Sequence, residues 1–72
     1  MFEISIGSNI KFFRRKRGFS RSELANKLNI SVHTITKYEQ GQREVKAVRL
    51  SEIAKILNVD INQLVENKII GG

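Results

Sequence analysis

The sequence predicts an all-α domain of five short helices packed around one core. The 72 residues include no proline and no cysteine, while leucine, isoleucine, lysine, glutamate and asparagine recur, a composition typical of linked helices. Apolar residues also recur at intervals of three and four, which is the spacing of one helix face. A chain of this length buries only about 60% of its unfolded surface. Because disulfides and thiolate metal sites are absent, close helix packing must supply the stability.

The first predicted helix covers residues 7 to 17. Ile6, Ile10 and Phe13 follow an i, i+4, i+7 pattern, and Gly18 provides a helix end. Phe12 falls outside this inward-facing stripe, and we expect it to be half-buried.

A capping box predicts the start of the second helix, over residues 21 to 28. The hydroxyl of Ser20 can accept from the amide of Glu23, whose side chain reaches back to the amide of Ser20. The inward face consists of Leu24, Ala25 and Leu28. Asn29 suits the left-handed conformation that ends a helix, and Ser31 can cap a third helix directly afterwards.

The stretch VHTITKY, residues 32 to 38, is rich in residues that favour β-strands. As a strand it would have no cleanly apolar face. As a helix it gathers Ile35 and Tyr38 on one face, with Ser31 as cap and Gly41 as terminator. Burying two large apolar side chains is worth about 1.5–3 kcal/mol each, which outweighs propensity differences of a few tenths of a kcal/mol per residue. We therefore predict a third helix here.

Two more helices are predicted in the C-terminal part. One runs from residue 46 to 57, with Lys46 at its start opposing the helix dipole. Its apolar positions are Val48, Leu50, Ile53, Ala54 and Leu57. A second capping box, Asp60 to Gln63, opens a short helix that ends near residue 66. Residues 1–72 thus form a single domain, with a core from 6 to 66 and a tail from 67 to 72.

The charge of the chain is positive and unevenly distributed. A formal net charge of +6 and a pI near 10.2 indicate a polyanionic partner. Residues 1 to 49 carry eleven basic and four acidic side chains, a net charge of +7, whereas residues 50 to 72 carry two and three, a net charge of −1. We expect the first two thirds of the chain to face the polyanion.

The sequence gives no sign of a membrane partner. No apolar run approaches the roughly 18 residues that a membrane-spanning helix needs. The N-terminal stretch MFEISIGSN lacks the basic and then apolar build of a signal peptide. We expect a cytoplasmic, nucleoid-associated protein.

The second and third helices, joined by a tight turn, form a helix-turn-helix, and the second helix of such a pair fits the roughly 12 Å wide major groove of B-DNA. The motifs E-L-A-x-x-L, S-x-x-T-I-x-x-Y-E-x-G and L-x-x-I-A-K-I-L follow one another along the chain. From Ile6 to Val65 the chain resembles the lambda-repressor-like, Xre/Cro-type helix-turn-helix domain. The resemblance implies sequence-specific binding of double-stranded DNA by a bacterial or phage transcriptional regulator, with repression favoured over activation.

The resemblance also assigns roles by position. Arg14 and Glu39 match a charged pair that ties the first helix to the third. Base contacts fall on Val32, His33, Thr36 and Lys37. Phosphate contacts fall on Ser20, Arg21, Ser31, Gln40, Gln42, Arg43 and Lys46. Arg21 stands where such domains most often have glutamine, and Val45 and Lys46 stand where they often have Pro-Ser.

Several of these residues also have plainer explanations. His33 could be a solvated surface side chain, and as the sole histidine, in a chain without cysteine, it has no second nitrogen or sulfur ligand for a metal. Lys37 could reach guanine O6 and N7 or serve only solubility. Val32 suits either the core edge or a thymine methyl group. The run RRKR, residues 14 to 17, stabilises a helix end by about 0.3–1 kcal/mol per residue. We therefore assign residues 15 to 17 to the general positive field of the protein rather than to specific contacts.

Other classes of function fit less well. Ser31, His33 and Glu39 share one short helix without a pocket, so they cannot form a catalytic triad, and we expect no enzyme, no cofactor and no metal. The main alternative is a protein-interaction module, such as an antitoxin or adaptor, with secondary DNA binding. Binding to RNA or an anionic membrane is favoured by charge alone, without stacking aromatics or a broad basic amphipathic face.

A homodimer follows from the size of the target. One recognition helix reads only about four or five base pairs, too few to find one site among roughly 10⁶ competitors. The near-neutral C-terminal third, Leu50 to Gly72, is available for a twofold contact. The apolar residues expected on that contact surface are Leu64, Val65, Ile69 and Ile70. Such a dimer implies an inverted-repeat operator.

Overall fold

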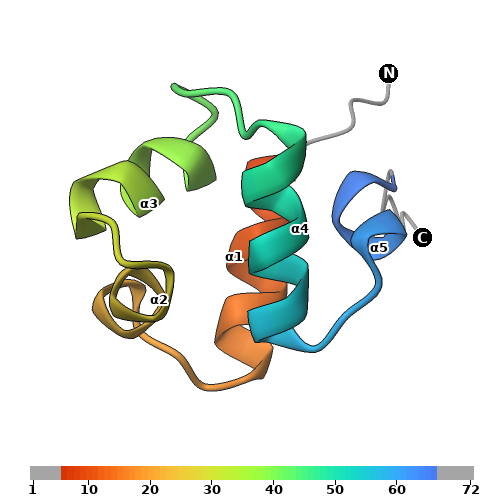
Figure 1. The fold of residues 1–72 in the computed structure, drawn as a ribbon, viewed down its shortest axis with the longest axis horizontal. Helices are drawn as coiled ribbons and strands as arrows, with labels where there is room; N and C mark the ends of the chain where they lie inside the picture. The colour runs from red at the N-terminus through yellow and green to blue at the C-terminus, as the bar shows by residue number, and fades with distance from the viewer. Residues whose placement is uncertain (1–5, 67–72) are drawn as a thin grey trace.

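The computed structural model describes residues 6–66, which form five helices. The helices are α1 (Ile6–Lys16), α2 (Arg21–Leu28), α3 (Val32–Glu39), α4 (Ala47–Leu57) and α5 (Ile61–Val65). The all-α, five-helix prediction is therefore confirmed, and the segment VHTITKY is helical. Helices α1 and α4 run side by side through the middle of the domain, with α2 and α3 on one side and α5 on the other (Figure 1).

One hydrophobic core holds these helices together, and every helix contributes to it. Its buried residues are Ile10, Phe13, Leu24, Ala25, Leu28, Ile35, Tyr38, Leu50, Ile53, Ala54, Leu57 and Leu64. In α1 to α4 these residues recur at intervals of three or four, with adjacent pairs at Leu24–Ala25 and Ile53–Ala54, and so occupy one face of each helix. The two β-branched and aromatic residues of α3 that we expected inside, Ile35 and Tyr38, are 0% and 7% exposed.

Local hydrogen bonds set the start of α2 and the turn between α2 and α3. The Ser20 capping box is present, with Glu23 N donating to Ser20 Oγ at 3.0 Å and Ser20 N donating to Glu23 Oε1 at 2.7 Å. Asn29 adopts the left-handed conformation, at φ 59° and ψ 43°. Ser31 then caps α3 by accepting from Thr34 N at 3.2 Å. Only three residues therefore separate the last residue of α2 from the first of α3.

The C-terminal caps follow the same chemistry. Asn58 ends α4 in the left-handed conformation, at φ 59° and ψ 46°. Asparagine takes the same conformation here as at Asn29, because it tolerates the left-handed region that ends a helix. Asp60 and Gln63 form the predicted capping box of α5. Lys46 is the N-cap of α4 and makes no capping hydrogen bond with its side chain.

Three expectations about exposure are wrong. Phe12 is 57% exposed rather than half-buried, and Val48, expected on the inward stripe of its helix, is 75% exposed. Each stands two residues from a buried residue, Ile10 or Leu50, and therefore lies about 160° around the helix from it. Leu64 has no exposed surface. It fills the core from α5 and cannot belong to a contact between two copies, while Ile69 and Ile70 lie outside the described residues.

Two residues of α1 make close contacts that the sequence did not indicate. The side chain of Asn9 is buried, and its Nδ2 donates to the carbonyl oxygens of Leu64 at 2.7 Å and Glu66 at 2.9 Å. These bonds satisfy carbonyls at the end of α5, which have no partner within the helix. Gly7 lies against the end of α3, where α1 and α3 meet.

None of the helices among residues 6–66 has the length and apolar character needed to cross a membrane.

Candidate nucleic-acid interface

Helix α3 presents one face to the core and the other to solvent. Ile35, Tyr38 and Glu39 are buried, whereas Val32 is 43% exposed and His33 is also exposed. The structure therefore places Val32 outside the core, which leaves its apolar side chain free for a ligand. Thr36 and Lys37, the other two predicted base-contact residues, are half-buried. The hydroxyl of Thr36 donates to the carbonyl of Val32 at 3.2 Å, so its oxygen still offers an acceptor.

The N-terminus of α2 lies beside the C-terminal end of α3. Arg21 is the first residue of α2, and its Nε donates to Oε1 of Glu39, the last residue of α3, at 3.0 Å. Of the predicted phosphate-contact residues, Arg21 is thus bonded to Glu39, which directly precedes Gln40 in the chain. Ser20 is exposed, but its hydroxyl already accepts from Glu23 N. Ser31 lies at the other end of α3, in contact with Thr34.

The predicted pair of Arg14 and Glu39 is present as a buried ion pair. Nε of Arg14 donates to Oε2 of Glu39 at 2.6 Å, and its Nη2 donates to Oε1 at 3.2 Å. Nη1 of Arg14 also donates to the carbonyl of Phe19 at 2.8 Å, just before α2 begins. Within residues 6–66, no buried side-chain nitrogen or oxygen lacks a hydrogen-bond partner. This ion pair fixes α1, the start of α2 and the end of α3 relative to one another.

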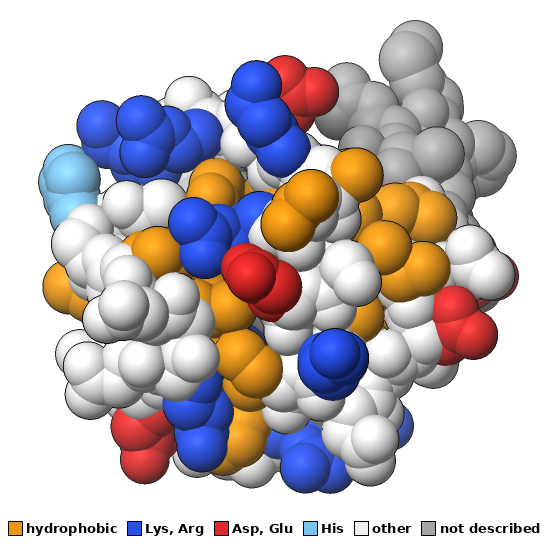
Figure 2. All heavy atoms as spheres, in the orientation of Figure 1, with side chains coloured by type: hydrophobic (Ala, Val, Ile, Leu, Met, Phe, Trp, Pro, Cys, Tyr) orange, Lys and Arg blue, Asp and Glu red, His pale blue; other side chains and the backbone are white. Residues whose placement is uncertain are grey.

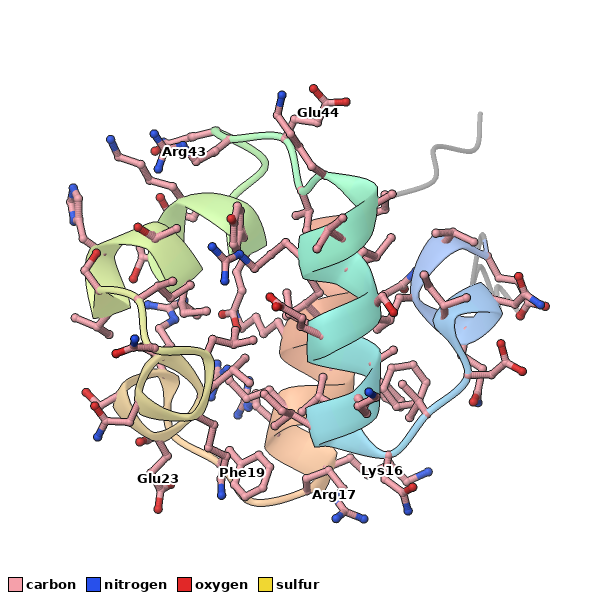
Figure 3. The ribbon with its side chains drawn as sticks, viewed as in Figure 1. Lys16, Arg17, Phe19, Glu23, Arg43 and Glu44 are labelled. Carbon is pink, nitrogen blue, oxygen red and sulfur yellow. The ribbon has the colours of Figure 1, made fainter. Side chains whose placement is uncertain are left out.

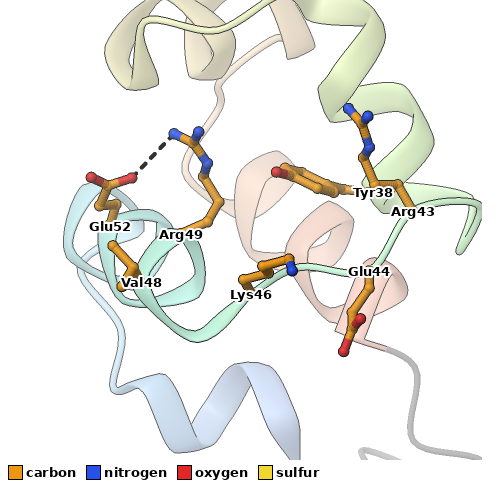
Figure 4. A pocket seen from close by; sticks show the side chains of 7 residues that line it. All are labelled: Tyr38, Arg43, Glu44, Lys46, Val48, Arg49 and Glu52. Atoms are coloured by element: carbon orange, nitrogen blue, oxygen red, sulfur yellow. Dashed lines mark hydrogen bonds and ion pairs between the residues drawn. The ribbon is translucent and has the colours of Figure 1, made fainter.

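The segment between α3 and α4 supplies the remaining basic groups. Gln40, Gln42, Arg43 and Lys46 are all exposed. A hollow of about 540 Å³ lies between this segment, the end of α3 and the start of α4 (Figure 4). Arg43, Lys46 and Arg49 line it, together with Glu44 and Glu52. Arg49 donates to Glu52 at 3.1 Å. Sequence reasoning missed Arg49, although basic residues at positions 43, 46 and 49 follow a three-residue spacing.

Positive charge gathers where these segments meet. Lys and Arg side chains line the edge formed by α3 and the segment that follows it (Figure 2). Arg43 lies at this edge, whereas Lys16 and Arg17 lie at the opposite end of the molecule (Figure 3). This separation fits our assignment of the basic run at the end of α1 to the helix dipole and the general field rather than to specific contacts.

The imagined triad of Ser31, His33 and Glu39 is not assembled. The carboxylate of Glu39 has no exposed surface and is bonded to two arginines, whereas His33 is exposed on the opposite face of α3. Among residues 6–66, no group of three histidine, cysteine or acidic side chains is placed to hold a metal ion. The residues around α3 instead offer hydrogen-bond donors and an exposed helix face, which are suited to binding a ligand surface.

Two short helices joined at a left-handed asparagine, with the second exposed beside a basic edge, define a helix-turn-helix protein. A family model described as helix-turn-helix matches residues 10–64. The chain therefore belongs to the lambda-repressor-like, Xre-type helix-turn-helix family.

Relatives with this domain carry names of regulators. An uncharacterized HTH-type transcriptional regulator of Sinorhizobium medicae is 38% identical over 65 residues, which cover 90% of this chain and 47% of the relative. The HTH-type transcriptional regulator YazB of Bacillus subtilis is 31% identical over 58 residues, or 81% of this chain and 84% of YazB. The chain spans about half the length of several other curated relatives that it matches.

Solved structures agree on the fold. SinR, described as the master regulator for biofilm formation and solved in complex with DNA, superposes with a TM-score of 0.79 at 27% identity, covering 85% of this chain and 98% of the SinR chain. The restriction-modification controller protein C.AhdI of Aeromonas hydrophila gives a TM-score of 0.79 at 24% identity, covering 85% of this chain and 92% of that chain. At 24% identity, the likeness to C.AhdI shows a shared fold and nothing more.

Proposed function

We propose that this chain is the DNA-binding part of a bacterial or phage transcriptional regulator, and that it recognises a specific sequence in double-stranded DNA. The observation that carries the proposal is the geometry of α3, which buries Ile35 and Tyr38 and leaves Val32 and His33 exposed. An isolated helix face of this kind fits the major groove. The relative SinR, in complex with DNA, has the same fold and supports this reading.

In the proposed complex the two kinds of contact are separated. The base edges are read by Val32, His33, Thr36 and Lys37. The phosphates are held by Ser20, Arg21 and Ser31 at the starts of α2 and α3, and by Gln40, Gln42, Arg43 and Lys46 after α3. Phosphate contacts fix the position of the helix, and base contacts supply the specificity. The protein acts in the cytoplasm at the nucleoid, as a repressor that occupies its operator.

The working form is a homodimer on an inverted-repeat operator. A single α3 reads only about four or five base pairs, so two copies are needed for a unique site. The contact between copies belongs to the near-neutral C-terminal third of the chain, where Leu50, Ile53, Ala54, Leu57 and Leu64 already serve the core. The contact must therefore use other residues of that third.

Selection from genomic DNA fragments, followed by footprinting, tests the proposal. We expect one or a few protected sites that persist against an excess of competitor DNA, with an affinity that falls steeply as salt rises. Equal binding to every duplex would overturn sequence specificity. Absence of duplex binding, with retention of a partner protein instead, would favour the interaction-module alternative.

A further inference from the structure

The carboxylate of Glu39 joins the interior of the domain to its proposed phosphate-binding surface. Its Oε2 accepts from Arg14, and its Oε1 accepts from both Arg14 and Arg21, at 3.2 and 3.0 Å. The side chain of Glu39 is 0% exposed, that of Arg14 is 9% exposed and that of Arg21 is 35% exposed. The three side chains thus form a continuous row from the core to the solvent.

This row carries more positive than negative charge. Two guanidinium groups share one carboxylate. Arg14 is committed to the interior, because its third nitrogen donates to the carbonyl of Phe19 at 2.8 Å. The surplus positive charge therefore belongs to Arg21, the one partly exposed member of the row.

The position of Arg21 is unfavourable by local rules alone. It is the first residue of α2, where the helix dipole disfavours a cation. Its Nε is bonded to Glu39, while its two Nη nitrogens make no hydrogen bond within residues 6–66. A guanidinium held at Nε still presents donors in the planar arrangement that fits phosphate oxygens.

We propose that Glu39 is a positioning residue for DNA binding and acts through Arg21. The inference rests on the proposed function, since it concerns a phosphate of duplex DNA. With Nε held by Glu39, the side chain of Arg21 has less conformational freedom to lose when its Nη groups bind a phosphate. A larger part of the interaction energy therefore contributes to the binding affinity. The bond between Arg21 and Glu39 persists in the complex, because phosphate and carboxylate use different nitrogens.

Replacing Glu39 with glutamine separates the positioning role from a simple charge effect, because the two predict opposite changes in DNA affinity. Glu39→Gln raises the net charge by one, so charge alone predicts tighter DNA binding and a steeper salt dependence. Positioning predicts weaker binding, by about tenfold, which corresponds to the loss of one charge-assisted hydrogen bond. The probe is a labelled duplex of random sequence, measured by fluorescence anisotropy at a temperature where circular dichroism shows the variant to be helical. Unchanged or tighter binding overturns the proposal.

A double variant asks whether Glu39 acts through Arg21. In the Arg21→Ala background, Glu39→Gln should cause no further loss of affinity, because the side chain that it positions is gone. An equally large loss in that background would place the effect of Glu39 elsewhere and overturn the proposal.

A measurement on the wild-type chain does not depend on the stability of the Glu39→Gln variant. The Nε–Hε NMR signal of Arg21, assigned by its absence from the Arg21→Lys spectrum, should persist when the duplex is added in excess. Its loss would show that Arg21 leaves Glu39 to reach DNA, which overturns the proposal.

Arg21→Lys should also weaken binding by about tenfold, whereas the exposed control Arg17→Lys should stay within about twofold.

Binding of the wild-type chain and binding of the Glu39→Gln variant test different claims. If the wild-type chain does not bind the duplex, the proposed function and the role of Glu39 are both overturned. If the wild-type chain binds and Glu39→Gln binds more tightly, only the role of Glu39 is overturned.

Discussion

The backbone of Gly7 in α1 touches the backbone of Tyr38 in α3. A β-carbon built on Gly7 would lie 2.2 Å from the carbonyl oxygen of Tyr38 and 2.8 Å from that of Glu39. Both distances are far below van der Waals contact, and both neighbours are backbone atoms that cannot rotate away. The absence of a side chain at residue 7 therefore sets how closely α1 approaches the end of α3.

We expect Gly7→Ala to lower the free energy of unfolding. The added methyl group must separate the helices or strain the backbone, which should cost about 1–3 kcal/mol. Alanine also gains roughly 1 kcal/mol in helix propensity over glycine, and we expect the steric cost to exceed this gain. Urea denaturation measures the difference. Lys11→Ala, an exposed change in the same helix, serves as the control and should remain within about 0.5 kcal/mol of the wild type. Equal stability of the two variants would contradict the close approach.

The ion pair between Arg14 and Glu39 should contribute strongly to stability. Glu39→Ala leaves the guanidinium of Arg14 buried without its carboxylate, which should cost about 3–5 kcal/mol. The matched control is Glu52→Ala, since Glu52 pairs with Arg49 at the surface and is 52% exposed. A surface pair is worth about 0–1 kcal/mol. Similar melting temperatures for the two variants would show that burial does not strengthen the Arg14 pair.

Arg21→Ala should weaken binding to all DNA sequences by the same factor. Loss of one phosphate contact lowers the slope of log affinity against log salt by about one. The measurement is a salt titration with two unrelated duplexes. Lys55→Ala removes the same charge from α4 and should leave the slope close to that of the wild type. A change in sequence preference with Arg21→Ala would argue against a phosphate contact.

Lys37→Ala should instead alter specificity. If the ammonium reads a guanine, its loss costs about 1–3 kcal/mol on the preferred site and relaxes the preference at one base pair. Selection from a random duplex library before and after the substitution reports this directly. Equal weakening on every sequence would assign Lys37 to the phosphates.

The operator should contain two inverted half-sites about ten base pairs apart, centre to centre, because a twofold dimer places its two α3 helices about 34 Å apart on one face of the DNA. A footprint with a single unrepeated half-site would exclude the dimer. Sedimentation of the free chain tests whether the two copies associate before they meet DNA.

The sequence by itself determined the helices and their ends. Helix faces follow from the spacing of apolar residues, and caps such as those of Ser20 and Asp60 are hydrogen bonds between residues two or three positions apart. Such contacts form between neighbours in the chain, so a pattern of neighbours predicts them. The turn at Asn29 follows the same rule. The buried pair of Arg14 and Glu39 was predicted only through resemblance to a family.

Only the tertiary structure decided which helix faces meet and how closely. Arg21 and Glu39 are 18 residues apart, and Asn9 donates to a carbonyl 55 residues away, so no local pattern indicates either bond. The burial of Leu64 depends in the same way on where α5 packs. Contacts of this kind form only where the helices pack together, because the helices offer several faces of similar apolarity. The folded state is the arrangement that fills the core and satisfies the buried polar groups.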